Sequence, residues 1–217
     1  ICKRLSNLGG YPITLHQIHS PLGFSSIEKE MNAMADLIEE GKIKYVGVSN
    51  FNAIRMRRAY RALERRGHKL VSNQVVYSIL NRKIESAEVI DTARELGVTI
   101  IAYSPLAQGL VSGKFHEDCK LINKRVGSRK YMNKFKKEGL TKSQPVIDKL
   151  KNIAEEYNAT PSQVALNWLI NFHKNLVVAI PGATKIRQAE ENTDTMNFSL
   201  SQIHLDILDE VSTSYKF

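Results

Sequence analysis

Short apolar runs alternate with longer amphipathic stretches along this chain. The short runs are rich in β-branched and aromatic residues, a composition typical of β-strands. We expect five strands, in the runs ITLHQI (13–18), KYVGV (44–48), VSNQVV (71–76), VTIIAY (98–103) and LVVAI (176–180). The last two runs are apolar at almost every position, which indicates strands buried on both faces, as in a parallel sheet.

The stretches between the strands have the period of amphipathic helices. In the first, apolar residues recur at positions 27, 31, 34 and 38, which is the spacing of one helix face. Ser25 and Glu28 form a predicted capping box before this face, and Gly41 follows its end. A second helix is expected between Asn52 and Gly67.

Two further helices are predicted by their ends. The apolar face of 89–96 stops at Gly97, a residue that favours the left-handed conformation at helix C-termini. The segment TPSQ (160–163) combines an N-cap threonine, a proline at the first helical position and a glutamine at the third. A helix over the following residues VALNWLINF is therefore expected.

The order of strands and helices predicts the fold class. The first four strands begin at residues 13, 44, 71 and 98, so their starts are 31, 27 and 27 residues apart. Regular strand–helix alternation predicts an α/β fold with a parallel sheet and right-handed crossovers. A doubly wound sheet usually has a glycine-rich turn after its first strand, and none is present here. We therefore predict a (β/α)8 TIM barrel.

The chain is expected to contain only part of such a barrel. A closed barrel needs eight strands in about 250 residues, whereas this chain has 217 residues and five expected strands. It begins with Ile1, inside what resembles the end of a helix, so we expect about three further βα units, roughly 80–100 residues, on its N-terminal side. We predict that residues 1–217 form a single domain made of about the last five strand–helix units.

One long interruption follows the fourth expected strand. Residues 106–144 show no regular apolar period. A structureless segment of this length in a compact domain is usually a lid, a binding loop or disordered. We expect one of these three for the segment.

The composition is that of a globular protein with a basic surface. Hydrophobic residues make up 42% of the chain and charged residues 24%, and the formal net charge is +9. Much of the positive charge lies in 55–66 and 123–142. Such runs are usually solvated helix faces and loops, and no nucleic-acid-binding motif accompanies them. We expect no nucleic-acid partner, with a small phosphate-rich ligand as the alternative explanation.

The sequence also limits the setting of the protein. No stretch approaches 18 consecutive apolar residues, so no membrane-spanning helix is expected, and the first residues lack the pattern of a secretory signal. Cys2 and Cys119 make neither a disulfide scaffold nor a zinc motif. His16 and His19, three residues apart on one strand, point to opposite faces and cannot share a metal ion. A reducing, cytoplasmic setting without a bound metal is expected.

Candidate chemistry gathers where the strands end. In a barrel, the reactive residues lie at the C-terminal ends of the strands and in the loops that follow. Here those ends carry amides, hydroxyls, a histidine and an aromatic ring but no carboxylate, which argues against acid–base hydrolysis of glycosides. The residues concerned are His19-Ser20, Ser49-Asn50, Asn73-Gln74, Tyr103-Ser104 and 181–184.

Two loops also have the composition of a phosphate site. The segments SPLAQGLVSGK (104–114) and PGATKIRQAEEN (181–192) follow the last two expected strands. Glycines let a backbone approach a ligand closely, and Lys114, Lys185 and Arg187 can offset negative charge. Barrels often bind phosphate at the loops after their last two strands, so the pair predicts an anionic ligand.

Five blocks of this sequence resemble the aldo-keto reductase family. They are GKIKYVGVSNF, SNQVVYSIL, GVTIIAYSPLAQGLVSGKF, TPSQVALNWL and IPGATKIRQAEEN, in the family's order and spacing. The resemblance extends over essentially all 217 residues. The long segment after Tyr103 and the motif SPLAQGL are similar to the bacterial and plant branches related to potassium-channel β-subunits.

The resemblance implies an oxidoreductase that reduces small aldehydes or ketones with NADPH in a (β/α)8 barrel, without a metal. By the same resemblance, Ser49, Asn50 and Gln74 would hold the nicotinamide carboxamide, and Tyr103 would stack on the nicotinamide ring. The diphosphate would lie along Ser104, Leu106, Gln108, Gly109, Leu110, Ser112 and Lys114. The adenosine end would lie along Gly182, Ala183, Thr184, Lys185, Gln188, Glu191 and Asn192.

Two positions depart from the family pattern. Members with a strict NADPH preference often carry lysine and arginine where this chain has Gly182 and Gln188. Lys185 and Arg187 could contact the 2′-phosphate instead, so NADPH is expected, with NADH as the alternative.

Of the family's catalytic tyrosine, lysine, aspartate and histidine, only the histidine has a match, His19, which would orient the substrate carbonyl. The other three belong to the strands expected on the N-terminal side.

Two functions are therefore compatible with the sequence. The first is a carbonyl reductase that acts on a small-molecule substrate. The second is a truncated, catalytically inactive module that binds a nucleotide or a partner. Every predicted cofactor position keeps a residue of suitable chemistry, which favours the reductase. The physiological substrate and the oligomeric state are not predicted.

Overall fold

The computed structural model describes residues 1–23, 25–124 and 127–215, and the chain divides into two compact units. The first unit contains Ile1–Val75 and Lys83–Ile101, and the second contains Val76–Arg82 and Ala102–Phe217. The division passes through two strands near their C-terminal ends. Each unit has its own buried apolar core.

The strands follow one another in the order β1-β2-β3-β4-β5. β1 pairs with β2, and β2 with β3, in parallel, and helices separate consecutive strands along the chain. This is the arrangement of consecutive units of a (β/α)8 barrel, so the predicted fold class is confirmed. Each strand lies within one residue of its predicted run, with the bounds Ile13–Ile18 (β1), Ile43–Ser49 (β2), Leu70–Val76 (β3), Thr99–Tyr103 (β4) and Val177–Ile180 (β5).

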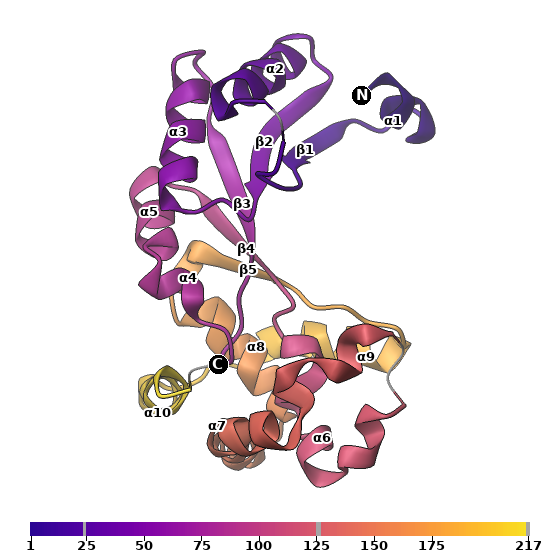
Figure 1. Ribbon diagram of the computed structural model, residues 1–217, viewed down its shortest axis with the longest axis vertical. Coiled ribbons are helices and arrows are strands. Elements are labelled where there is room, and N and C mark those ends of the chain that lie inside the picture. The colour runs from indigo at the N-terminus through magenta and orange to yellow at the C-terminus, as the bar shows by residue number, and fades with distance from the viewer. Residues whose placement is uncertain (24, 125–126, 216–217) are drawn as a thin grey trace. The chain divides into compact units, whose positions relative to one another are not determined.

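Three helices of the first unit pack side by side along its strands (Figure 1). α2 contacts both β2 and α3, and α3 contacts α5. Their inner faces are apolar, and Met31, Met34, Met56 and Leu63 are all 6% exposed or less. The helices of this unit are α1 (Cys2–Asn7), α2 (Ile27–Glu39), α3 (Ala53–Glu64), α4 (Lys83–Ser86) and α5 (Val89–Leu96).

α2 begins one residue later than its predicted capping box requires. The N-cap residue is Ser26, not Ser25, and its Oγ accepts a hydrogen bond from Lys29 N at 3.3 Å. The expected pairing of Ser25 with Glu28 is therefore wrong. A start at Ile27 brings that side chain, 9% exposed, onto the buried face of the helix.

Two other predicted helix starts are confirmed by their capping bonds. Asn52 Oδ1 accepts a hydrogen bond from Arg55 N at 2.9 Å at the start of α3. At the start of α8 (Pro161–Asn171), Thr160 Oγ1 accepts from Gln163 N, and Gln163 Oε1 accepts from Thr160 N. The side chains satisfy backbone groups that a helix end leaves unpaired.

The basic run 55–66 lies on α3 and the two residues after it, and it is paired with acidic residues of α2 and α5. The pairs are Arg57 with Glu95, Arg58 with Glu28, and Arg66 with Asp36 and Glu39. Exposed ion pairs of this kind contribute little free energy each. The run therefore forms ion pairs between neighbouring helices at the protein surface. This agrees in large part with the prediction of a solvated helix face.

Helices α7 and α8 form the centre of the second unit. Trp168 of α8 is 0% exposed and stacks on Phe172, with ring centroids 4.8 Å apart. Arg82 lies over these two rings at 5.0 and 5.1 Å, and its Nη2 forms an ion pair with Asp209 of α10 at 2.6 Å. The other helices of this unit are α6 (Lys114–Glu117), α7 (Lys137–Glu156), α9 (Ile186–Asp194) and α10 (Gln202–Thr213).

The segment 106–144 is not structureless where the structure describes it, which corrects the sequence prediction. It consists of short turns and α6, and α7 begins within it. Phe115 and Phe135 pack edge to face with ring centroids 5.4 Å apart and are 2% and 3% exposed. Short turns leave no apolar period for the sequence to reveal. The 3-10 turns of the unit are η1 (Ala107–Ser112), η2 (Cys119–Ile122), η3 (Ser128–Tyr131), η4 (Asn133–Phe135), η5 (Lys174–Leu176) and η6 (Thr195–Asn197).

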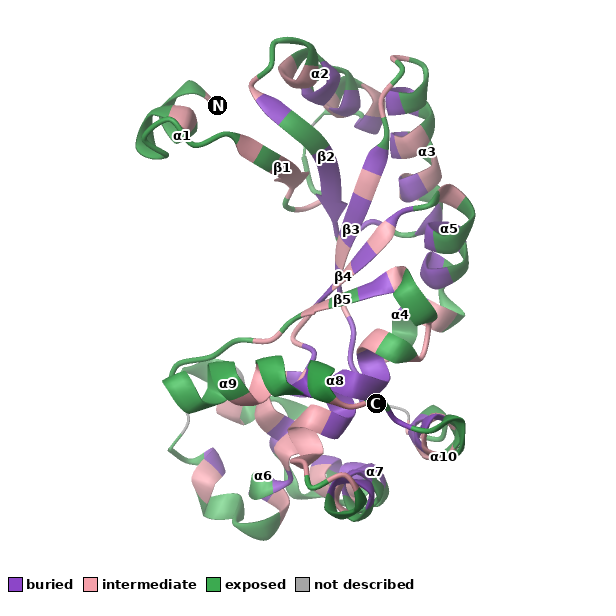
Figure 2. Cartoon of the chain, turned by 180° about the vertical axis from the view of Figure 1, so that it is seen from behind, coloured by how far each residue is buried: buried purple, intermediate pink, exposed green. Residues whose placement is uncertain are grey.

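Burial differs strongly between elements of the same unit (Figure 2). In the first unit, most residues of β2 are buried, whereas β1 has no buried residue. In the second unit, α8 is buried along most of its length, and α9 has no buried residue. α9 is therefore a surface helix.

Candidate functional site

Ser49 and Gln74 stand side by side at the C-terminal ends of β2 and β3. They are register partners in the parallel pair, and Ser49 Oγ donates a hydrogen bond to Gln74 O at 2.9 Å. Ser49 is 4% exposed. Parallel strands bring their carboxyl ends to the same edge of a sheet. The structure thus brings these two predicted residues together.

Asn50 extends this group with a left-handed backbone. Its φ is +60°, its backbone N–H donates to Gln74 O at 2.9 Å, and its Nδ2 donates to Ser49 Oγ at 3.1 Å. Asparagine tolerates this conformation better than most residues, and non-glycine residues that adopt it cluster at functional sites. Asn50 is exposed, so a ligand can reach it.

Asn73 fixes the turn after β2, a role that the sequence does not reveal. It is 0% exposed, its Nδ2 donates to Phe51 O at 2.9 Å, and its Oδ1 accepts from Phe51 N at 3.4 Å. These bonds satisfy a buried amide and hold the backbone next to Asn50. The available signal is a polar side chain between Val71 and Val75, the residues two positions away on the same face of the strand, since buried polar groups are almost always bonded.

His19 comes directly after β1 and is exposed. His16, on the same strand, is partly buried, and its Nε2 lies 3.4 Å from Arg4 Nη1. Burial, and secondarily the charge of Arg4, lowers the pKa of His16 below its usual value. Of these two histidines, His19 is the one that a ligand can approach directly.

A small polar layer crosses the strands two residues before Ser49 on β2 and Gln74 on β3. Gln17, Gly47 and Ser72 are register partners on β1, β2 and β3. Gln17 Nε2 reaches across Gly47 to donate to Ser72 Oγ at 3.3 Å. A Cβ atom on Gly47 would collide with Ser72 Oγ and lie 3.0 Å from Gln17 Cγ. Glycine is required because Ser72 Oγ and the glutamine side chain occupy this space.

The turn after β4 contains a run of left-handed residues. The φ angle is +53° at Ser104, +48° at Ala107, +62° at Gln108 and +87° at Gly109. A left-handed non-glycine residue costs roughly 1–2 kcal/mol, so the surrounding structure must hold the turn in place. Leu106 has φ −91° and ψ 16°, and the next residue, Ala107, is left-handed. A right-handed residue followed by a left-handed one is typical of backbone concavities that bind anions.

Several of the predicted ligand groups in this turn are engaged within it. Ala107 N donates to Ser104 O at 2.9 Å, and Gly109 N donates to Leu106 O at 2.8 Å. Ser112 Oγ donates to Gly109 O at 2.8 Å. These internal bonds stabilise the turn. Because Gly109 has no side chain, a ligand could approach its backbone closely, and this would be its contribution to binding.

Leu110 and Lys114 differ sharply in exposure. Leu110 is 0% exposed, so the whole residue belongs to the buried core of its unit. Lys114 is exposed, with its Nζ 5.0 Å from the ring centroid of Phe115. Helices α7 and α8 both contact η1, and the burial of Leu110 anchors the turn to the core of its unit.

Tyr103 is held at the end of β4 by a second tyrosine. Its carbonyl oxygen accepts a hydrogen bond from Tyr77 N at 3.3 Å. Tyr77 is 0% exposed, and its hydroxyl oxygen lies 2.9 Å from His173 Nε2. Tyr77 thus connects the backbone of Tyr103 to the core of the second unit.

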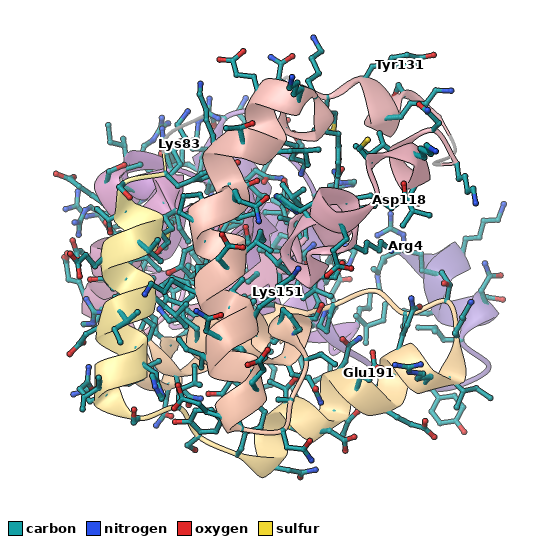
Figure 3. All side chains as sticks on the ribbon, turned by 90° about the horizontal axis from the view of Figure 1, so that it is seen from below. Arg4, Lys83, Asp118, Tyr131, Lys151 and Glu191 are labelled. Atoms are coloured by element: carbon teal, nitrogen blue, oxygen red, sulfur yellow. The ribbon has the colours of Figure 1, made fainter. Side chains whose placement is uncertain are left out.

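The third predicted group lies on an exposed segment of the second unit. Residues 182–190 are exposed, and a Cβ atom on Gly182 would meet nothing within 4 Å. Thr184 N and Oγ1 donate to Gln188 Oε1 at 2.8 and 3.1 Å. Arg187 Nε donates at 2.7 Å to Glu191 Oε1, a residue labelled on α9 in Figure 3. Most polar side chains of the segment are therefore paired with one another.

A cavity of about 670 Å³ lies in the second unit, and none of the predicted site residues lines it. His116 lines it, and its Nε2 lies 2.9 Å from Ser143 Oγ. Burial, and secondarily the charge of Lys151, lowers the pKa of His116. Lys151 (Figure 3) also pairs with Glu117 at 2.6 Å. The apolar side chains that line the cavity are Phe115, Ile122, Phe135 and Leu140.

The described residues hold neither a cluster of potential metal ligands nor a helix that could span a membrane. In residues 1–23, 25–124 and 127–215, no group of three or more His, Cys, Asp or Glu side chains is placed to hold a metal ion. No helix in the described part of the chain has the length and apolarity that crossing a membrane requires.

Polar strand ends on parallel strands that alternate with helices are the features of a (β/α)8-barrel protein with its binding residues at the C-terminal edge. Residues 1–213 match the Aldo/keto reductase family. The chain belongs to that family, as its sequence blocks indicate.

Similar proteins are longer than this chain. Aldo-keto reductase str7 of Strobilurus tenacellus is 36% identical over 200 residues, which cover 91% of this chain and 57% of that protein. An uncharacterized oxidoreductase of Mycobacterium tuberculosis is 37% identical over 204 residues, covering 94% and 60%. A crystal structure of a thermostable aldo-keto reductase in complex with the inhibitor epalrestat has a TM-score of 0.73 and 27% identity, covering 95% and 62%. The chain thus spans about three-fifths of the length of these relatives.

Proposed function

We propose that this chain is the cofactor-binding part of an NADPH-dependent reductase that converts small aldehydes or ketones to alcohols. Family membership supports oxidoreduction as the reaction class. The strongest structural support for the proposal is the turn from Ser104 to Gly109, which contains four left-handed residues. A strained backbone persists where the surroundings enforce it, commonly at functional sites, and this conformation suits an anion such as a diphosphate.

In the first unit, Ser49, Asn50 and Gln74 would hold the nicotinamide carboxamide. A carboxamide presents both an acceptor oxygen and a donor NH₂ group, and amide side chains complement both. The hydrogen bonds from Asn50 Nδ2 to Ser49 Oγ and from Ser49 Oγ to Gln74 O fix this group before any ligand binds. When bound, NADPH supplies the hydride.

In the second unit, Tyr103 would stack on the nicotinamide ring, and the turn after it would receive the diphosphate. The residues proposed for the diphosphate are Ser104, Leu106, Gln108, Gly109, Leu110, Ser112 and Lys114. Leu110, which is 0% exposed, would contribute to this set from the buried side of the turn. Lys114, which is exposed, would offset negative charge.

The segment 182–192 would hold the adenosine end of the cofactor. Lys185 is the better candidate for the 2′-phosphate, because Arg187 is already paired with Glu191 at 2.7 Å. A cation at this place would favour NADPH over NADH. The residues proposed for this end are Gly182, Ala183, Thr184, Lys185, Gln188, Glu191 and Asn192.

His19 would orient the substrate carbonyl, since it is exposed at the end of β1. The proposal includes a small-molecule substrate and no nucleic-acid or membrane partner. A cytoplasmic location and the formation of a single domain by residues 1–217 stay predictions.

Substitution of Tyr103 tests the proposal. Tyr103→Ala should weaken NADPH binding about five- to tenfold, because it removes an aromatic stacking partner. Tyr103→Phe keeps the ring and should bind like the wild type. Tyr131→Ala is the matched control, since Tyr131 is 69% exposed on η3 and takes no part in the proposed site. The measurement is a fluorescence titration of the full chain with NADPH.

Equal NADPH affinity in the wild type, Tyr103→Ala and Tyr131→Ala would contradict the site assignment. Consumption of NADPH in the presence of small aldehydes would support the reductase over the nucleotide-binding module. Binding without turnover fits both functions, because the resemblance places only His19 of the family's catalytic group in this chain.

A further inference from the structure

Lys134 reaches the turn after β4 from a distant part of the chain. Its Nζ donates a hydrogen bond at 3.3 Å to the carbonyl oxygen of Ala107, 27 residues earlier. Ala107 is 6% exposed and has a φ of +48°. The ammonium group therefore meets the turn at one of its strained residues.

The neighbouring Phe135 fixes the position of Lys134. Phe135 is 3% exposed and packs edge to face on Phe115 of α6, with ring centroids 5.4 Å apart. η4, which carries both Lys134 and Phe135, also contacts α7. Lys134 Nζ lies 5.5 Å from the ring centroid of Phe135. Buried aromatic packing thus anchors the short segment from which the ammonium group extends to Ala107.

A charge-assisted hydrogen bond at this carbonyl has a direct energetic effect on the turn. Such bonds are roughly twice as strong as neutral ones, and left-handed alanine is unfavourable by about 1–2 kcal/mol. The internal bonds of the turn, from Ala107 N to Ser104 O and from Gly109 N to Leu106 O, are neutral ones. The bond from Lys134 adds a cation to a turn otherwise closed by backbone groups.

We propose that Lys134 is a positioning residue for the cofactor. It holds Ala107, and with it the turn from Ser104 to Gly109, in the conformation that receives the diphosphate. This inference rests on the proposed function, because the ligand concerned is the diphosphate of NADPH. Lys134 acts through Ala107 and through the shape of the turn.

Three variants of the full chain test this role. Lys134→Met removes the cation and should weaken NADPH binding about tenfold, the typical effect of losing a hydrogen bond to a charged group. Lys134→Arg keeps a charged donor and should stay within about threefold of the wild type. Lys136→Met removes the same charge from an exposed side chain and should leave affinity within about twofold.

Hydrogen exchange without cofactor gives a second readout. Backbone amides of 108–112 should exchange faster in Lys134→Met than in the wild type, because the turn loses its support. Amides in the buried part of α8, residues 164–169, should exchange at the wild-type rate. This pattern separates positioning of the turn from a general loss of stability.

Three results would overturn the inference. The first is equal NADPH affinity of Lys134→Met and Lys136→Met while the wild type binds well, in which case the proposed function stands and the role of Lys134 does not. The second is unchanged exchange of 108–112 in Lys134→Met. The third is equally accelerated exchange in α8. Failure of the wild type to bind NADPH would instead contradict the proposed function, and the exchange experiment would still decide whether Lys134 supports the turn.

Discussion

Gly47 is the residue in the first unit whose identity the structure explains most directly. The Gln17 side chain passes across it to Ser72 Oγ at 3.3 Å, and a Cβ atom there would collide with that oxygen. Gly47→Ala should therefore lower the free energy of unfolding by about 1–3 kcal/mol, the usual cost of overpacking. Urea unfolding followed by circular dichroism measures the change.

Gly182→Ala is the matched control for this prediction. A Cβ atom on Gly182 would meet nothing within 4 Å, so the free energy of unfolding should change by less than about 0.5 kcal/mol. Adding Ser72→Ala to Gly47→Ala removes the colliding oxygen and should restore part of the lost stability. Equal effects of the two glycine substitutions would show that the layer of Gln17, Gly47 and Ser72 is not tightly packed.

The lowered pKa of His116 predicts that the free energy of unfolding depends on pH. Burial, and then the charge of Lys151, lowers its pKa from the usual 6.5, while Asp148 acts in the opposite direction. The unfolded chain therefore takes up a proton near pH 6.5, whereas the folded chain does so only at lower pH. The contribution to stability is complete above the unfolded pKa and is lost as the pH falls through 6.5 towards the folded pKa.

Thermal unfolding between pH 7.5 and 5.5 measures this effect when the wild type is compared with His116→Gln. The wild type should lose stability more steeply than the variant as the pH falls, because glutamine does not titrate. The comparison also cancels the contribution of His16, whose pKa is lowered in the same direction. Parallel curves for the two proteins would contradict the assigned role of His116.

At single positions, the sequence reveals side-chain chemistry better than backbone conformation. The proximity of Ser49 and Gln74 follows from the geometry of parallel strand ends and could be predicted. The left-handed conformation of Ala107 and Gln108 could not be predicted, because neither residue type favours it. The contact of Lys134 with Ala107 is also invisible in the sequence, since it joins residues that are 27 positions apart.

Among the elements, α10 accepts three hydrogen bonds from one arginine of a distant segment. Arg82 Nη1 donates to Asp209 O, Ser212 Oγ and Thr213 Oγ1 at 3.1, 2.8 and 3.0 Å. Its side chain is only 13% exposed. Arg82→Lys should lower the free energy of unfolding by about 1–3 kcal/mol, because an ammonium group cannot reproduce the planar set of donors.

Hydrogen exchange of α10 locates the effect of Arg82→Lys. Amides of 205–212 should exchange faster than in the wild type, since they lose the contacts that hold the helix. Arg94→Lys is the control, because the Arg94–Asp91 pair is exposed on α5. The prediction is wrong if both variants leave exchange in α10 unchanged.

Elements with a regular apolar period could be predicted, and those without one could not. Helices α2, α3, α5 and α8 have such a period, the strands are runs of β-branched and aromatic residues, and the observed bounds lie close to the expected ones. α9 buries none of its residues, so no apolar stripe marks it in the sequence. The 3-10 turns between Ala107 and Phe135 are too short to show a period.

At the scale of the whole molecule, the net charge of +9 has a partial structural explanation. Arginines of α3 form ion pairs with acidic residues of α2 and α5. Part of the positive charge of the first unit is therefore neutralised in ion pairs between neighbouring helices. The basic residues Lys114, Lys134 and Lys185 of the second unit are the ones to which we assign a role towards the cofactor.

The chain covers 57–62% of the length of the relatives to which it is compared. The resemblance places only His19 of the family's catalytic group in these residues, and its catalytic role stays a prediction. Cofactor binding is therefore a more direct test of this chain than turnover.

The most direct test of the central claim is hydrogen exchange of the full chain with and without NADPH. The account predicts protection of backbone amides in three places: at 49–51 and 74, in the turn 104–112, and at 183–188. Protection confined to 115–144, around the cavity, or absent altogether would contradict the claim that these strand ends and loops hold the cofactor.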